Sequence, residues 1–220
     1  FPKSDRACHL LREHFSLVLK NERIPIKLQS IWMAQFDLRI KEIVRLEKLR
    51  RRTGEPVALE TFGKYAIELK NNEIFFITAK ADRIDKGSNG FTIYDYKTGQ
   101  VSKRTLERFS PQLDIEAIML NNRSFKSVSK GSVSALSLIG LGSDPKQYEK
   151  LVTKENLVQW RSGLVKIIEQ MKLELTPFVA LAKPLVNNNF SDNYLHLSRF
   201  GEWNDNDEPT ETLIETYPLS

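Results

Sequence analysis

Cysteine is almost absent from this chain, which contains only Cys8 among its 220 residues. One thiol cannot form a disulfide within the chain, nor can it supply the several thiolates that a zinc knuckle or an iron–sulfur cluster requires. A disulfide framework and an iron–sulfur cluster built within this chain are therefore excluded. We expect a reducing, cytoplasmic setting.

Long apolar runs are also missing. The longest, such as residues 135–141 interrupted by Ser137, fall far short of the roughly 20 residues that a membrane-spanning helix needs. We therefore expect no membrane or secretory segment. Because the first residue is Phe1 rather than methionine, we expect the chain to be a piece of a longer protein rather than a processed product.

Neither sign of charge dominates: 33 Lys and Arg face 28 Asp and Glu, a net charge of +5. This excess is compatible with binding nucleic acid but does not demonstrate it. The 40% hydrophobic content can fill a core, so we expect one domain over residues 1–203, followed by a mobile tail at 204–220. Within it we expect a helical part at 4–52, a sheet core at 55–141 and C-terminal helices at 153–203.

The helical part shows apolar residues at helical spacing. A first helix, capped by Ser4 or Asp5, would bury Leu11, Phe15, Val18 and Leu19. A second, at about 28–52, would bury Trp32, Phe36, Ile40 and Ile43. It ends in the basic residues Arg45, Lys48, Arg50, Arg51 and Arg52. These can be a solvated face at a helix C-terminus or contacts to a phosphate backbone, and both interpretations stay open.

After Gly54 the apolar residues alternate, which predicts a meander of strands at 57–61, 65–69, 74–84 and 91–96. A short helix at about 111–120 and a buried strand at 133–141 follow. A last long helix would present Leu157, Trp160, Leu164, Ile167 and Met171 on one face.

The most informative segments are 79–85 and 91–99, two strand-like runs that flank a turn of glycine and asparagine at 87–90. A loop at 88–89 puts Asp82 opposite Asp95, whereas a loop at 89–90 puts Asp82 opposite Lys97. Side chains alternate with period two along a strand, so both registers place Asp82, Asp95 and Lys97 on one face.

Two facing carboxylates repel each other unless a positive charge lies between them. Mg²⁺ or Mn²⁺ would remove that conflict and could activate a water for attack on phosphorus, with Lys97 stabilising the charge that develops. The alternative is that Asp95 and Lys97 only solubilise a surface hairpin. Against it, Asp95 ends the apolar run of Phe91, Ile93 and Tyr94, where a purely structural strand would stay apolar.

Residues 81–85 (ADRID) and 93–99 (IYDYKTG), followed by 110–113 (SPQL), resemble the paired motifs and the Gln-containing helix of the RecB-like branch of the PD-(D/E)xK nuclease superfamily. Residues 112–120 and 194–203 are similar to the C-terminal nuclease domain of the AddB family, a subunit of bacterial AddAB helicase-nucleases. The resemblance implies a restriction-endonuclease-like α/β fold, with a mixed central sheet flanked by helices.

The resemblance also implies a function: metal-dependent trimming of DNA, with single-stranded ends as substrate, during double-strand break repair beside an AddA-like helicase-nuclease subunit. The cofactor would be Mg²⁺ or Mn²⁺. Asp82 and Asp95 would be metal ligands, joined by the carbonyl of Tyr96. Lys97 would be the catalytic lysine, and Gln112 would contact the substrate strand or brace the site.

Two further residues have roles only by this resemblance. His9, six residues before Phe15, matches a metal-binding histidine on the first helix; the alternative is an exposed histidine. Glu60 matches an acidic residue that often accompanies the site, and a simple surface glutamate is the alternative. Glu116 is a departure, because relatives often have tyrosine there. A catalytically silent DNA-binding or assembly module and a stand-alone nuclease of the same superfamily remain alternative functions.

Overall fold

The computed structural model describes residues 1–108, 111–129, 131–173 and 176. Contacts group the chain into two units, Phe1–Ile167 and Ile168–Ser220. The predicted tail at 204–220, the motif at 194–203 and Ser110 lie outside the described residues, and the predicted domain boundaries stay predictions. None of the described helices combines the length and apolarity that crossing a bilayer requires.

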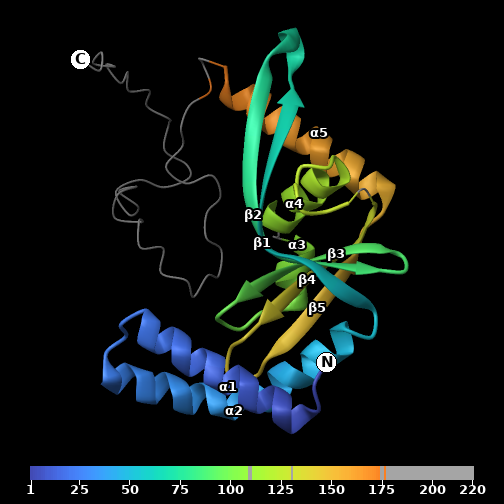
Figure 1. Ribbon diagram of the computed structural model, residues 1–220. Coiled ribbons are helices and arrows are strands. Elements are labelled where there is room, and N and C mark those ends of the chain that lie inside the picture. Colours follow the sequence, from blue (N-terminus) through green and yellow to red (C-terminus); the bar gives the residue numbers. More distant parts are fainter. Residues whose placement is uncertain (109–110, 130, 174–175, 177–220) are drawn as a thin grey trace, which may run out of the picture. The chain divides into compact units, whose positions relative to one another are not determined.

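One five-stranded sheet organises the first unit, in the order β1-β2-β3-β4-β5 (Figure 1). The strands are β1 (Gly54–Glu68), β2 (Ile74–Gly87), β3 (Gly90–Lys97), β4 (Val133–Gly140) and β5 (Lys146–Leu151). The pair β3–β4 is parallel and the other pairs are antiparallel. The sheet is therefore mixed, which confirms the predicted α/β fold class and the predicted meander of β1, β2 and β3.

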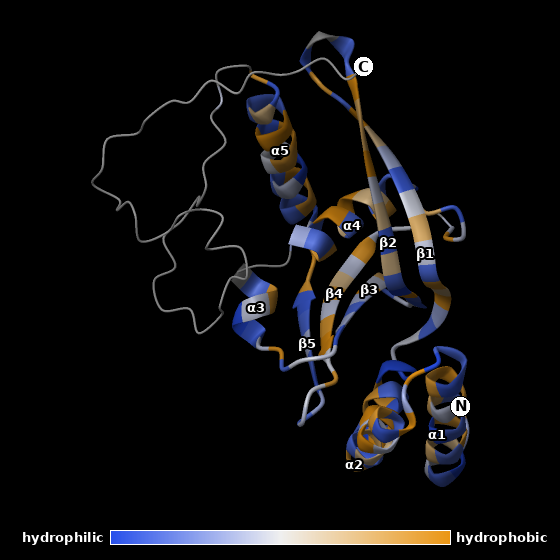
Figure 2. Ribbon diagram, turned by 90° about the vertical axis from the view of Figure 1, so that its left-hand side faces the viewer, coloured by the Kyte–Doolittle hydropathy of each residue, from blue (hydrophilic) through white to orange (hydrophobic). Residues whose placement is uncertain are grey.

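The helices are α1 (Ser4–Asn21), α2 (Ile26–Arg50), α3 (Lys103–Arg108), α4 (Pro111–Asn121) and α5 (Lys154–Met171), with a short 3-10 turn at Lys70–Asn72. A parallel pair of strands needs a crossover connection, and α3 and α4 supply it between β3 and β4. Helix α4 packs on β3 and β4. Both α4 and β4 are strongly apolar (Figure 2), and they meet in the core through Leu113, Ala117, Leu136 and Leu138.

Three elements differ from the sequence prediction. The strands expected at 57–61 and 65–69 are one strand, because Gly63 stays extended where its missing side chain leaves room for the ring of Phe125. Strand β5 was not predicted; it is charged and has no buried residue, which is typical of a strand at the edge of a sheet. Helix α3 is six residues long, too short for a periodic pattern.

Two apolar residues predicted to be buried are exposed, Val18 at 52% and Trp32 at 39%. The reason is that α1 and α2 pack against each other, with the rings of Phe15 and Phe36 stacked 4.2 Å apart. A helix pair of this kind covers only a narrow stripe of each partner, so residues beside the stripe stay accessible to solvent.

Candidate active site

The hairpin between β2 and β3 has the first of the two registers considered above. Gly87 pairs with Gly90, so Ser88 and Asn89 form the loop. Gly90 has φ +131°, and a side chain there would meet the carbonyl oxygen of Ser132 at 2.5 Å. Both constraints require glycine at position 90. The ladder runs to the pair Arg83 and Tyr94, and the next step places Asp82 opposite Asp95.

Asp82, Asp95 and Lys97 lie together on one face of this hairpin. The Lys97 ammonium is 2.9 Å from Oδ2 and 3.1 Å from Oδ1 of Asp95. Oδ2 of Asp82 accepts a hydrogen bond from the backbone N–H of Tyr96 at 2.8 Å. The Asp95 side chain is 6% exposed and that of Lys97 is 49% exposed. A buried carboxyl group therefore lies beside an ammonium group that solvent or a substrate can reach.

The electrostatics of this face disfavour a second negative charge. Burial raises the pKa of Asp95 above its ordinary value, and the charge of Asp82 raises it further, while Lys97 lowers it. A divalent cation between the two carboxylates would reverse this balance, because it favours the charged form of both. Two adjacent hard oxygen donors on rigid strands suit Mg²⁺ or Mn²⁺, so the donor set fits the predicted ion.

We expect Asp95→Asn to raise the melting temperature of the metal-free protein. A raised pKa means that folding favours the neutral acid, so the contribution of this group is present at low pH and is lost as pH rises through the pKa of the folded state. A gain of about 1 kcal/mol would raise Tm by about 2–4 °C in a protein of this size. Thermal melts in chelator at pH 7 measure this effect. A marked fall in Tm would contradict the electrostatic account.

Helix α4 brings two more polar side chains to the same place. Lys97 donates to Oε1 of Gln112 at 3.5 Å, and Nε2 of Gln112 donates to Oε1 of Glu116 at 3.2 Å. Gln112 therefore lies beside Lys97, and its predicted contact with the substrate strand, or its bracing of the site, stays a prediction. Glu116 was noted only as a departure from the resemblance. Its place among buried apolar helix positions was the signal that could have revealed it.

Arg83 and Asp85, which alternate with Asp82 along β2, face the opposite side of the sheet. Arg83 is 5% exposed and binds Asp85 through two hydrogen bonds of 2.6 and 2.7 Å. It also donates to Glu47 of α2 at 2.6 Å. Glu47 accepts from Arg50 and Arg51 as well, and these bonds lower the pKa of Glu47 to about 2 despite its burial. Sequence reasoning missed this cluster, which fixes the strand that carries Asp82.

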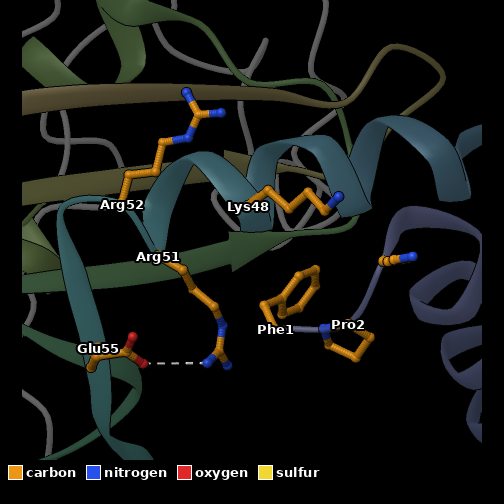
Figure 3. Close-up of a pocket in the computed structure, with 7 residues that line it drawn as sticks. Phe1, Pro2, Lys48, Arg51, Arg52 and Glu55 are labelled. Atoms are coloured by element: carbon orange, nitrogen blue, oxygen red, sulfur yellow. Dashed lines mark hydrogen bonds and ion pairs between the residues drawn. The ribbon is translucent and has the colours of Figure 1, made fainter.

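The basic end of α2 contains structural and accessible cations. Arg45 pairs with Glu42, and both Arg50 and Arg51 pair with Glu47. These pairs support a structural role for those three arginines. Lys48 and Arg52 instead line a surface pocket with Arg51 (Figure 3), whose other lining residues are Phe1, Pro2, Lys3 and Glu55. Contact with a phosphate backbone stays a prediction for Lys48 and Arg52.

His9 and Glu60 are not joined to the two aspartates in one ligand group. His9 is exposed on α1, 3.3 Å from Glu13. Glu60 lies on β1 between Leu59 and Thr61, the partners of Arg83 and Ala81; it has φ 47° and pairs with Lys80 at 2.6 Å. Within the described ranges, no group of three or more histidine, cysteine or acidic residues is placed to hold a metal ion. The roles of His9, Glu60 and the Tyr96 carbonyl stay predictions.

The chain is similar to several uncharacterized proteins from Rickettsia species. It is 33% identical over 132 residues to one from Rickettsia typhi, an alignment that covers 58% of this chain and 15% of the relative. It is 30% identical over 128 residues to one from Rickettsia felis, covering 57% and 15%. A third, from Rickettsia conorii, is 26% identical over 203 residues, covering 84% and 24%. The aligned part of the chain thus spans only 15% to 24% of the length of these relatives.

A comparison with protein families gives a broader match. Residues 2–181 match the sequence profile of the PD-(D/E)XK nuclease superfamily. This range includes both strands of the β2–β3 hairpin and the whole of α4. Members of this superfamily are typically metal-dependent nucleases, in agreement with the paired aspartates and the lysine described above. The chain belongs to the PD-(D/E)XK nuclease superfamily.

Proposed function

We propose that this protein is a metal-dependent deoxyribonuclease that hydrolyses phosphodiester bonds, acting exonucleolytically on single-stranded DNA ends. The observation that carries the proposal is the convergence of Asp82, Asp95 and Lys97 on one face of the β2–β3 hairpin. A buried acid, a second acid opposite it and an accessible ammonium group are the chemical parts that phosphodiester hydrolysis needs.

In this proposal, the carboxylates of Asp82 and Asp95 would hold Mg²⁺ or Mn²⁺, with the Tyr96 carbonyl as a further ligand. When bound, the ion would supply Lewis-acid activation of the phosphate and of the attacking water. Lys97 would stabilise negative charge on the phosphoryl oxygens in the transition state. Its ammonium is held by Asp95 and Gln112, so little reorganisation would be needed as that charge develops.

We further propose that the domain belongs to the RecB-like branch and resembles the nuclease domain of AddB. It would act in the cytoplasm, in double-strand break repair, beside an AddA-like helicase-nuclease subunit. The motifs at 81–85, 93–99 and 112–120 support this assignment. The place of Gln112 beside Lys97 also supports it, because the resemblance implies a glutamine that contacts the substrate strand or braces the site.

The test is incubation of the purified protein with end-labelled single-stranded DNA and Mg²⁺ or Mn²⁺. We expect the wild type to release labelled products and Asp82→Ala to release none above background, because half of the proposed ligand pair is lost. Asp37→Asn is a matched control, since it removes an exposed aspartate that pairs with Arg12 on α1. Binding of DNA without cleavage by the wild type would instead favour the silent module.

A further inference from the structure

Glu116 is an unusual side chain for its position. It lies in the middle of α4 and is 1% exposed, and its helical neighbours Leu113, Ala117 and Leu120 belong to the hydrophobic core. Its Oε2 atom is the one buried side-chain oxygen or nitrogen in the described part of the chain that has no hydrogen-bond partner in the protein. A buried carboxyl with an unpaired oxygen costs stability, so packing alone does not explain it.

The hydrogen bonds of Glu116 lead to the catalytic lysine. Its Oε1 accepts from Nε2 of Gln112, one helical turn earlier, and Oε1 of Gln112 accepts from Lys97. A lysine ammonium can only donate, so it requires the oxygen end of the amide. Glu116 accepts at the other end and thereby holds the nitrogen of the amide away from Lys97. An apolar residue at position 116 would accept no hydrogen bond from the Gln112 amide. At the end of the amide that faces helix α4, the two orientations would then be nearly equal in energy.

Glu116 is close to the two aspartates without forming a ligand group with them. Burial raises the pKa of Glu116 to about 7, and the charges of Asp95 and Asp82 act in the same direction. In the described part of the chain, however, Glu116, Asp95 and Asp82 do not form a group of three that could hold a metal ion. The geometry therefore favours an action through Gln112 over direct coordination.

We propose that Glu116 is a positioning residue of the active site, which orients the side-chain amide of Gln112 and through it the ammonium group of Lys97. This inference rests on the proposed nuclease function. In this proposal Glu116 would not contact the phosphate, and its effect would reach the reaction through Gln112, which contacts Lys97 and also acts on Asp95.

The first test is Glu116→Gln, which keeps the shape but can donate as well as accept, so it no longer selects one orientation of Gln112. We expect kcat on single-stranded DNA to fall by about 10- to 100-fold, with KM changed much less. Mn²⁺ affinity by calorimetry should stay nearly unchanged, because both carboxylates of the proposed ligand pair are kept. Tm in chelator should equal or exceed that of the wild type, whereas a purely structural residue would lower it.

Asp114→Asn is the matched control, because it neutralises another acid of α4, one that pairs with Lys150 at 2.8 Å. It should leave kcat unchanged. A large loss of Mn²⁺ affinity in Glu116→Gln would make Glu116 a ligand and overturn the positioning role. Unchanged kcat in Glu116→Gln, with cleavage by the wild type intact, would overturn it too and would leave the proposed nuclease function standing.

A double-mutant cycle tests whether the effect runs through Gln112. In a Gln112→Ala background, Glu116→Gln should cause little further loss of kcat, and additive losses would refute the inference. If the wild type itself does not cleave DNA, NMR of the Gln112 side-chain amide in the metal-free protein still decides the question. Its protons should exchange with water faster in Glu116→Gln than in the wild type, and unchanged exchange would refute the orientation by Glu116.

Discussion

Lys97→Ala is expected to reduce DNA cleavage by about 100- to 1,000-fold, to the limit of detection, while Mn²⁺ affinity stays nearly unchanged. The ammonium contacts Asp95 and Gln112 and is half-exposed on the catalytic face, where a phosphate can approach it. Alanine removes the positive charge that would stabilise the transition state. It leaves both carboxylates of the proposed ligand pair in place, so binding and catalysis should separate.

Single-turnover cleavage of end-labelled DNA and calorimetry with Mn²⁺ measure the two quantities on the same preparation. Lys103→Ala serves as the control, because Lys103 is an exposed lysine that pairs with Glu107 on α3. Cleavage by purified Lys97→Ala at more than a tenth of the wild-type rate would remove Lys97 from its catalytic role. A parallel loss of Mn²⁺ binding would show that the lysine also maintains the geometry of the ligands.

The face that carries Asp82, Asp95 and Lys97 was predictable from the sequence. It depends on the alternation of side chains along each strand and not on which residues of the two strands pair. Side chains alternate along any strand, so Asp82, Asp95 and Lys97 share a face whichever residues form the loop. The register itself was left open by the sequence, and it is decided by the pairing of Gly87 with Gly90. Gly90 can take its positive φ beside Ser132, which is far away in the sequence.

The contributions of distant elements could not be predicted from local patterns. Glu116 lies one turn after Gln112, but its contact with the site exists only because α4 packs on β3. In the same way, Arg83 binds Glu47, which lies 36 residues earlier in the sequence, on α2. The apolar pattern of α2 also placed Trp32 in a core, although α1 covers only part of that helix. Side-chain contacts of this range depend on how whole elements pack.

The buried ion pairs of Arg83 with Asp85 and Glu47 should contribute a large part of the stability of the fold. Arg83→Met is therefore expected to lower the free energy of unfolding by about 3–5 kcal/mol. Arg83 is almost fully buried, and methionine would leave Asp85 and Glu47 without their shared partner. Urea unfolding at pH 7 measures the loss. Arg12→Met, which removes an exposed pair with Asp37, should leave the free energy of unfolding nearly unchanged.

The difference in unfolding free energy between the wild type and Arg83→Met should depend on pH, and this dependence shows whether the charge of Arg83 causes it. The arginines lower the pKa of Glu47 from 4.5 to about 2, so its contribution to stability is complete above pH 4.5 and is lost as pH falls towards 2. The gap in unfolding free energy between the wild type and Arg83→Met should therefore be widest near neutral pH and should narrow through that window. A gap that stays constant from pH 7 to pH 3 would assign the loss to packing of the arginine stem rather than to its charge.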